Sequence, residues 1–232
     1  MTAAQAPAIP AGGLVVFDFD HTLFRGDSGT GLMVWMLRSN PLRAIVAMLA
    51  SPLIAPLFLW PSTRRIPISI YLWIATIGVG DGGIPAARIA DYVGRNAVDL
   101  RARLHPAALA ALHAHRAGGD AVVIATGAPA PLVHAILALA TDIALPVIGS
   151  TSAPCWGGRM TARHCHAENK LSMLREAGFE APIVRAYSDS TADLPLLRAA
   201  REPVVVNPRP RRVPIFRDAL GVRVPVLEWG GR

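Results

Sequence analysis

Residues 14–22, LVVFDFDHT, decide the fold of this 232-residue chain. A short apolar run ends there in two acidic residues, Asp18 and Asp20. Such runs are typical of strands buried on both faces of a parallel sheet. Side chains two positions apart on an extended strand point the same way, so both carboxylates can face one reacting centre. One could then attack while the other exchanges a proton. Two aspartates alone more often form a solvated turn, so the rest of the chain must decide.

Three later segments repeat the pattern of a buried strand. They are DAVVIATG at 120–127, IVRAYSDS at 183–190 and PVVVN at 203–207, and helix-like sequence follows the first two. Strands that alternate with helices predict an α/β fold, with a parallel sheet covered by helices on both faces. In such sheets ligands bind beyond the carboxyl ends of the strands. The polar residues at these ends are therefore the candidates for function.

Thr126 and Gly127 end the second strand just before a helix. A hydroxyl group and free backbone N–H groups at such a place can hold phosphate oxygens. A helix cap would explain Thr126 equally well.

The third strand end carries Ser188, Asp189, Ser190 and Asp193. Acidic residues placed beside Asp18 and Asp20 would repel them unless a cation intervenes, and Mg²⁺ accepts one or two carboxylates together with phosphate oxygens and water. Asp193 could instead cap the helix that follows it.

Lys170 is the only lysine among 23 basic residues. Its compact ammonium group, at the start of KLSMLREAG, could pair with both a nucleophile and a phosphate. The alternative is an ordinary surface lysine.

The order DxDxT, strand-end Thr, separate Lys and DSxxD resembles the haloacid dehalogenase superfamily of aspartate-nucleophile phosphatases. The resemblance implies a Rossmann-like parallel sheet core with an inserted helical cap. It also implies that Asp18 is the nucleophile, Asp20 the general acid and base, Thr126 a ligand of the phosphoryl group, and Lys170 a support for Asp18. The implied Mg²⁺ ligands are Asp18, the backbone carbonyl of Asp20, Asp189 and, in support, Asp193.

Residues 27–98 interrupt the α/β pattern. Charged residues are absent between Arg43 and Arg64 and again from 66 to 80, which predicts an apolar helical hairpin broken at Pro52, Pro56 and Pro67. A bilayer span needs about 20 apolar residues, so both runs are short for one. Two crossings would also place Arg64 and Arg65 on the far side, against the positive-inside tendency. We therefore expect two helices that dip into one leaflet, although a soluble helical cap is the alternative.

Within the superfamily, the chain resembles the phosphoserine-phosphatase-like branch and, in that branch, bacterial phosphatidylglycerophosphatase C. The segments that carry this likeness are residues 17–60, ISIYLWIATIGV, IATGAPAPLVHAI and MTARHCHAENK. It implies a phospholipid substrate, with Thr22, Gly127, Asp27, Arg64 and Arg65 as candidate substrate contacts. The chain departs from the pattern at His21 and Ala167, where glycine is usual. His164 and His166 could touch substrate, although a supporting or surface role is the more general expectation.

The composition, 52% hydrophobic and 17% charged, excludes a disordered or fibrous chain. A net charge of +7 favours anionic partners, and we expect a membrane surface and an anionic phospholipid rather than nucleic acid. Two cysteines fit a reducing compartment.

These patterns together predict a loose tail at 1–13, a catalytic core at 14–26 and 99–232, and an apolar cap at 27–98. The predicted protein is a Mg²⁺-dependent phosphatase of phosphatidylglycerophosphate on the cytoplasmic face of a bacterial inner membrane. The alternatives are a soluble phosphomonoesterase of phosphoserine-phosphatase type, which would be cytoplasmic, and an inactive membrane-attached binding protein. The sequence leaves the oligomeric state open.

Overall fold

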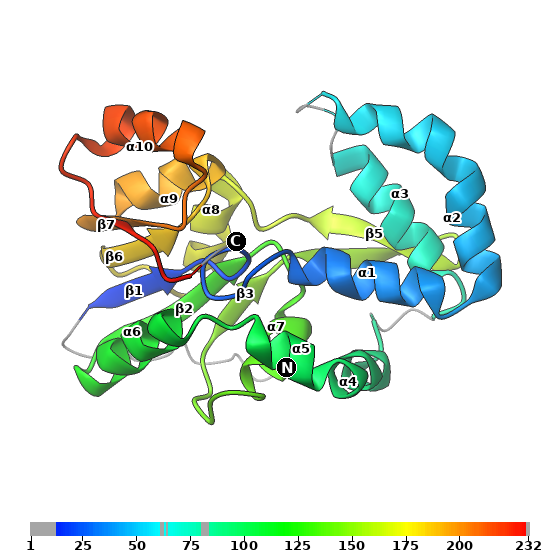
Figure 1. The fold of residues 1–232 in the computed structure, drawn as a ribbon, viewed down its shortest axis with the longest axis horizontal. Helices are drawn as coiled ribbons and strands as arrows, with labels where there is room; N and C mark the ends of the chain where they lie inside the picture. Colours follow the sequence, from blue (N-terminus) through cyan, green and yellow to red (C-terminus); the bar gives the residue numbers. More distant parts are fainter. Residues whose placement is uncertain (1–12, 61–62, 64, 80–83, 231–232) are drawn as a thin grey trace.

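The computed structural model describes residues 13–60, 63, 65–79 and 84–230. Its centre is a parallel sheet of six strands in the order β3-β2-β1-β6-β7-β8 (Figure 1). The strands are β1 (Leu14–Phe17), β2 (Ala121–Thr126), β3 (Val147–Gly149), β6 (Ile183–Ser188), β7 (Glu202–Val206) and β8 (Val226–Leu227). The predicted α/β class and the Rossmann-like sheet are therefore confirmed. The predicted tail lies almost entirely outside the described residues.

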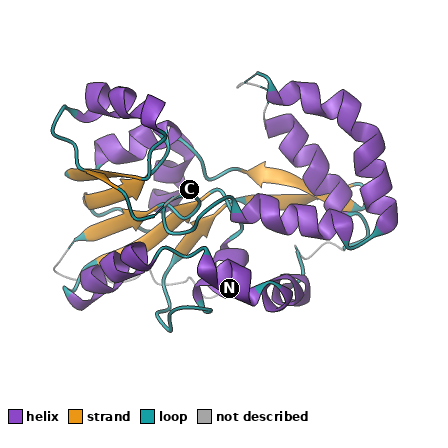
Figure 2. Cartoon of the chain, viewed as in Figure 1, coloured by secondary structure: helices purple, strands orange, loops and turns teal. Residues whose placement is uncertain are grey.

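Helices cover both faces of the sheet. Successive β1 side chains point to opposite sides, so β1 packs against both helical layers. Val15 and Phe17 pack toward α6 (Pro106–Ala117) and α7 (Ala130–Leu137). Leu14 and Val16 pack toward the other layer, formed by α8 (Glu168–Glu176), α9 (Leu194–Ala199) and α10 (Val213–Leu220) (Figure 2). Buried on both faces, β1 holds the residues that follow it at a fixed place on the carboxyl edge of the sheet.

The segment after β1 forms helices, as the charge-free runs predict. They are α1 (Ser28–Arg38), α2 (Pro41–Ile54), the short 3₁₀ helix η1 (Ala55–Phe58), α3 (Arg65–Thr76), α4 (Ala86–Arg95) and α5 (Ala97–Ala102). Asp27 and Asn40 cap α1 and α2 by accepting hydrogen bonds from backbone N–H groups. Pro52 lies inside α2 rather than breaking it, and Pro67 lies in the first turn of α3. The first turn of a helix tolerates proline because its N–H groups lack intrahelical partners.

An antiparallel hairpin of β4 (Thr151–Cys155) and β5 (Gly158–Arg163) connects the sheet with the inserted helices. Trp73 Nε1 donates to the carbonyl of Cys155 at 2.8 Å, and Arg159 N donates to Thr76 Oγ1 at 2.8 Å. A side chain at position 158 would meet Trp73 at 2.7 Å, so only glycine allows this approach. The sequence did not predict this hairpin, which places α3 beside the carboxyl edge of the sheet.

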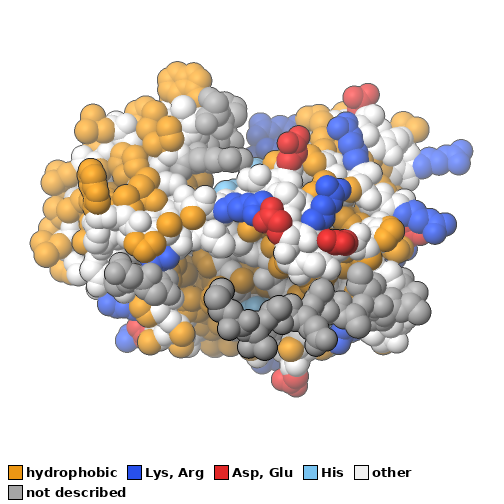
Figure 3. All heavy atoms as spheres, turned by 180° about the vertical axis from the view of Figure 1, so that it is seen from behind, with side chains coloured by type: hydrophobic (Ala, Val, Ile, Leu, Met, Phe, Trp, Pro, Cys, Tyr) orange, Lys and Arg blue, Asp and Glu red, His pale blue; other side chains and the backbone are white. Residues whose placement is uncertain are grey.

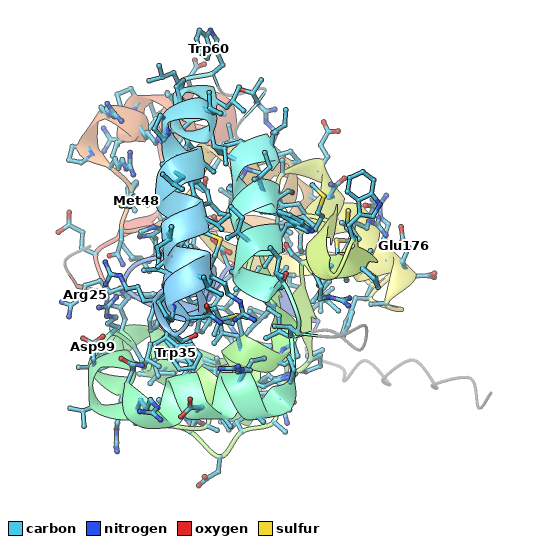
Figure 4. All side chains as sticks on the ribbon, turned by 90° about the vertical axis from the view of Figure 1, so that its right-hand side faces the viewer. Arg25, Trp35, Met48, Trp60, Asp99 and Glu176 are labelled. Atoms are coloured by element: carbon cyan, nitrogen blue, oxygen red, sulfur yellow. The ribbon has the colours of Figure 1, made fainter. Side chains whose placement is uncertain are left out.

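The outer side of the hairpin formed by α2, η1 and α3, hereafter the α2–α3 hairpin, is apolar and exposed. Leu53 is 83% exposed and Leu59 73%. Figure 3 shows hydrophobic side chains gathered at this end of the molecule and charged ones at the other. Trp60 stands at its tip and Met48 on its outer side, while Trp35 packs on Tyr92 at its base, with ring centroids 5.6 Å apart (Figure 4). By length and composition, residues Pro41–Phe58 could cross a membrane, with a mean hydropathy of 1.7 and 11% of the segment buried.

Candidate active site

Asp18, Lys170 and Asp193 form a buried ion network at the carboxyl edge of the sheet. Lys170 Nζ donates to Asp18 Oδ1 at 2.7 Å and to Asp193 Oδ2 at 2.7 Å. Asp18 follows β1, Lys170 lies in the first turn of α8, and Asp193 ends the 3₁₀ helix η2 (Thr191–Asp193) after β6. All three are less than 10% exposed. The fold thus brings together three groups that are far apart in the sequence.

Asp193 acts here as a support for Lys170. Its Oδ2 accepts a second hydrogen bond from Ser188 Oγ at 2.7 Å. Its side chain makes no capping bond to α9. The helix-cap alternative for Asp193 is therefore wrong, because its carboxylate points into the core toward Lys170 and Ser188.

The network carries more negative than positive charge. Burial raises the pKa of Asp18 well above its usual range, Lys170 opposes that rise, and the carboxylates of Asp193 and Asp189 add to it. Burial alone would lower the pKa of Lys170, but the charges of Asp18 and Asp193 outweigh burial and raise it. Lys170 therefore stays a cation, and its one ammonium group pairs with two carboxylates, Asp18 and Asp193, while Asp189 acts on Asp18.

Asp20 has the properties of a group that exchanges protons near neutral pH. Burial, together with the charge of Asp27, raises its pKa to about 7, although a hydrogen bond from Ser28 N opposes the rise. That bond, from Ser28 N to Asp20 Oδ1, measures 2.8 Å and fixes the carboxyl group at the start of α1. General acid and base catalysis is most effective when the pKa of the group lies near the working pH.

Gly127 and the carboxylates line one cleft of about 880 Å³, the carboxylates being Asp18, Asp20, Asp27, Asp189 and Asp193. Two other predicted contacts, Thr22 and Thr126, are not among its lining residues. Thr22 is fully buried, and its Oγ1 has no hydrogen-bond partner among the described residues. Its loop turns back, with Thr22 N bonded to the carbonyl of Phe19, and its contact with substrate stays a prediction. Thr126 is also fully buried and accepts a hydrogen bond from Ala128 N at 3.1 Å. Its phosphate-binding role stays a prediction.

The cleft has a charged floor and an apolar wall. The floor contains Asp18, Asp20, Lys170 and Asp189, and His164 and His166 also line the cleft. The wall consists of side chains from α1, α3 and α4 and the segment before α4, namely Leu32, Met33, Met36, Ile68, Leu72, Ile84 and Ile89. Of the predicted arginine contacts, Arg64 lies outside the described residues. Arg65 begins α3, and its contact with substrate stays a prediction.

The two departures from glycine coincide with left-handed backbone. His21 has φ 61° and Ala167 has φ 53°. Residues other than glycine rarely adopt backbone conformations with positive φ, so both positions carry backbone strain. Ala167 directly precedes α8, and its strain is therefore stored beside Lys170.

The donor set fits a Mg²⁺ ion. Among the described residues, no group of three or more His, Cys, Asp or Glu side chains is arranged to hold a metal. Mg²⁺ does not need such a group, since it takes one or two carboxylates and completes its shell with water and substrate oxygens. Asp193 Oδ1 is buried and has no hydrogen-bond partner in the part of the chain that the structure describes. That oxygen and the excess of negative charge are what a cation would compensate.

The fold and the site define an α/β enzyme that works with paired acidic groups and a buried lysine. The chain belongs to the haloacid dehalogenase-like hydrolase family, which it matches over residues 15–198. A protein of unknown function from Bordetella pertussis Tohama I has a similar structure, with 21% identity, a TM-score of 0.72 and coverage of 94% of this chain and 98% of that one.

Two further solved structures are similar over nearly their whole length. A phosphoserine phosphohydrolase-like protein from Francisella tularensis has 17% identity and a TM-score of 0.57, with 93% of this chain and 94% of that one covered. A phospho-aspartyl intermediate analogue of phosphoserine phosphatase has 13% identity and a TM-score of 0.53, with 94% of each chain covered. At these identities the likeness extends to the fold.

The sequence analysis missed several residues that line the cleft. Arg159 comes from the unpredicted β4–β5 hairpin, and Arg209 and Arg212 come from the loop and the short 3₁₀ helix after β7. The proline spacing in NPRPRR was the available signal, because prolines fix the direction of a loop.

Proposed function

We propose that this protein is a Mg²⁺-dependent phosphatase that hydrolyses a lipid phosphomonoester through an aspartyl-phosphate on Asp18. The substrate that fits best is phosphatidylglycerophosphate, which would yield phosphatidylglycerol and phosphate. The observation that carries the proposal is the Asp18–Lys170–Asp193 network on the floor of a cleft whose wall is apolar.

In the first half of the reaction, an Asp18 oxygen forms a bond to phosphorus while the bond from phosphorus to the ester oxygen breaks. Asp18 Oδ1 is held by Phe19 N at 2.9 Å and by Lys170 Nζ at 2.7 Å, so the attack falls to Oδ2. Asp20, with a pKa raised to about 7 by burial, donates its proton to the leaving alcohol oxygen.

In the second half, water attacks phosphorus and the bond to Asp18 breaks. Asp20, now a carboxylate, accepts the proton of that water. Lys170 offsets the negative charge that develops on the transferring group. Asp18, Asp189 and the backbone carbonyl of Asp20 would hold Mg²⁺, which supplies positive charge to the phosphoryl oxygens when bound.

The lipid part of the proposal rests on continuous apolar surface. Met33, Met36, Ile68 and Leu72 form the wall beside the charged floor, and Ile68 is also 37% exposed on the α2–α3 hairpin. An acyl chain bound there would keep its phosphate at the floor. Exposed Leu53, Leu59 and Trp60 are side chains that suit insertion at a membrane surface. The proposed location is the cytoplasmic face of a bacterial inner membrane.

A soluble phosphomonoesterase of phosphoserine-phosphatase type is the second candidate. The fold similarity to phosphoserine phosphatase favours it, and the buried site suits either substrate. An inactive binding protein fits less well, because burying two carboxylates around one lysine destabilises a fold and needs a functional reason.

A substrate comparison tests the proposal. Purified protein is assayed for phosphate release from phosphatidylglycerophosphate in detergent micelles, from phosphoserine and from p-nitrophenyl phosphate, each with Mg²⁺ and with a chelator. We expect Mg²⁺-dependent release and the highest kcat/KM on the lipid. A higher kcat/KM on phosphoserine would favour the soluble enzyme, and no release from any ester would contradict both enzymatic candidates.

A further inference from the structure

Arg209 and Arg212 reach the cleft of Asp18 from a loop whose backbone is tightly constrained. The chain leaves β7 at Asn207, which has φ 44° and donates its backbone N–H to the carbonyl of Leu227 at 2.8 Å. Pro208 and Pro210 flank Arg209 and restrict the backbone on both sides of it. The loop therefore crosses the carboxyl edge of the sheet in a defined direction.

The 3₁₀ helix η3 (Pro210–Arg212) sets the two arginines on one side. Arg212 N donates to the carbonyl of Arg209 at 2.7 Å, so the pair is three residues apart across one turn. Arg209 is the extended residue that precedes η3 and Arg212 is the last residue of η3, so this hydrogen bond joins the two ends of the turn. Arg209 and Arg212 line the cleft, whereas Arg211 between them is not among its lining residues.

We propose that Arg209 and Arg212 form an anion subsite for a second charged group of the substrate, either a phosphodiester or a carboxylate. The proposal rests on the proposed function and narrows its substrate class to phosphomonoesters with two anionic groups. Guanidinium groups bind such oxygens through paired N–H donors.

The division of the cleft supports this assignment. Lys170 and the backbone at Gly127 lie at the floor, where the reacting phosphoryl group would sit, so they are engaged by that group. The carboxylates of Asp18, Asp20 and Asp189 would repel a second anion near the floor. Arg209 and Arg212 line the same cleft but belong to a separate loop after β7, so their positive charge comes from a different element than that of Lys170.

The test compares the double variant Arg209→Gln/Arg212→Gln with the matched variant Arg211→Gln. Phosphatidylglycerophosphate in micelles supplies a phosphodiester, 3-phosphoglycerate supplies a carboxylate, and p-nitrophenyl phosphate has no second anion. We expect the double variant to lose at least about tenfold in kcat/KM, through KM, on one of the first two substrates. Its kcat/KM on p-nitrophenyl phosphate should stay within about twofold, as should that of Arg211→Gln on all three. The substrate that loses identifies the second anion.

An equal loss on p-nitrophenyl phosphate, an equal loss in Arg211→Gln, or no loss at all would overturn the subsite. Calorimetric binding to Asp18→Asn protein separates this failure from that of the proposed function. If the doubly anionic ester binds at least about tenfold more weakly once both arginines are replaced, the subsite stands even where the wild type hydrolyses no ester. Unchanged binding would overturn it.

Discussion

The carboxyl edge of the sheet buries charged side chains, whereas the α2–α3 hairpin exposes apolar ones. Lys170 is 2% exposed and Asp193 1%, while Leu53 is 83% exposed and Leu59 73%. Charged residues are seldom fully buried unless paired, and clustered apolar exposure on a monomer commonly marks a contact surface. Both regions therefore lower the stability of the fold. The buried charges at the sheet edge serve chemistry, and the exposed apolar side chains of the hairpin serve contact with another surface.

The largest expected effect concerns the charge balance of the core. Lys170→Met leaves Asp18 and Asp193 buried without their cation, which should destabilise the fold by about 3–5 kcal/mol and abolish phosphate release. Urea unfolding in the presence of a chelator measures the first effect. Arg175→Met, at an exposed position of α8, should change stability little. Equal stability of the two variants would mean that Lys170 does not balance the buried carboxylates.

The second prediction uses the raised pKa of Asp20. A folded-state pKa of about 7, against an ordinary 3.8, means that the folded state prefers the protonated form. Its contribution to stability is therefore present below the ordinary pKa and is lost as the pH rises to 7 and above, by up to about 4 kcal/mol. In metal-free protein, Asp20→Asn should thus stabilise the fold more at pH 8 than at pH 5. Urea unfolding measures the difference in unfolding free energy between Asp20→Asn and wild type. If that difference does not grow with pH, the raised pKa is contradicted.

The third prediction concerns the exposed apolar side chains of the α2–α3 hairpin. Leu53→Asp and Leu59→Asp should each weaken binding to phosphatidylglycerol vesicles by about tenfold or more, because burying a leucine side chain contributes about 1.5–3 kcal/mol. Vesicle flotation measures the binding, and circular dichroism checks the fold. Val98→Asp, at an 86% exposed position of α5, is the control and should bind as wild type does. Unweakened binding in the leucine variants would remove the hairpin from the membrane contact.

The smallest expected effect concerns backbone strain next to Lys170. Ala167 has φ 53° and ψ −130°, a conformation that glycine adopts without penalty. Ala167→Gly should therefore stabilise the fold by about 1–2 kcal/mol in urea unfolding. Ala177→Gly, at φ −83° at the opposite, C-terminal end of α8, should instead lower stability by up to about 1 kcal/mol. A loss of stability in Ala167→Gly would show that the left-handed conformation carries no strain.

The sequence predicted the strands whose apolar composition matches their burial in the sheet. Strands β1 and β2 are continuous apolar runs and β6 and β7 are largely apolar, and the ends of β1, β2 and β6 supply Asp18, Gly127 and Asp189. Strands β3 and β8 have three and two residues and are too short for a pattern to show. The β4–β5 hairpin lacks apolar alternation, and its Trp156–Gly157 turn, with positive φ at both residues, was the only local signal.

Contacts that depend on loop direction escaped prediction. Thr22 was expected at the cleft, but the turn at His21 sends its side chain into the core. Asp193 was left open between a cap and a metal ligand, and only the packing of α8 against α9 places it at Lys170. Arg209 and Arg212 enter the cleft from the loop that begins at left-handed Asn207, and the direction of that loop was not predicted.

The most direct test of the central claim is to trap the phosphorylated protein. Wild type is mixed with a substrate carrying a radiolabelled phosphoryl group and Mg²⁺, quenched in acid within milliseconds, and digested to map the label. We expect label on the peptide that contains Asp18, and none in Asp18→Asn, whose turnover should fall on the order of 10⁶-fold. Label on another residue, or turnover retained by Asp18→Asn, would contradict it.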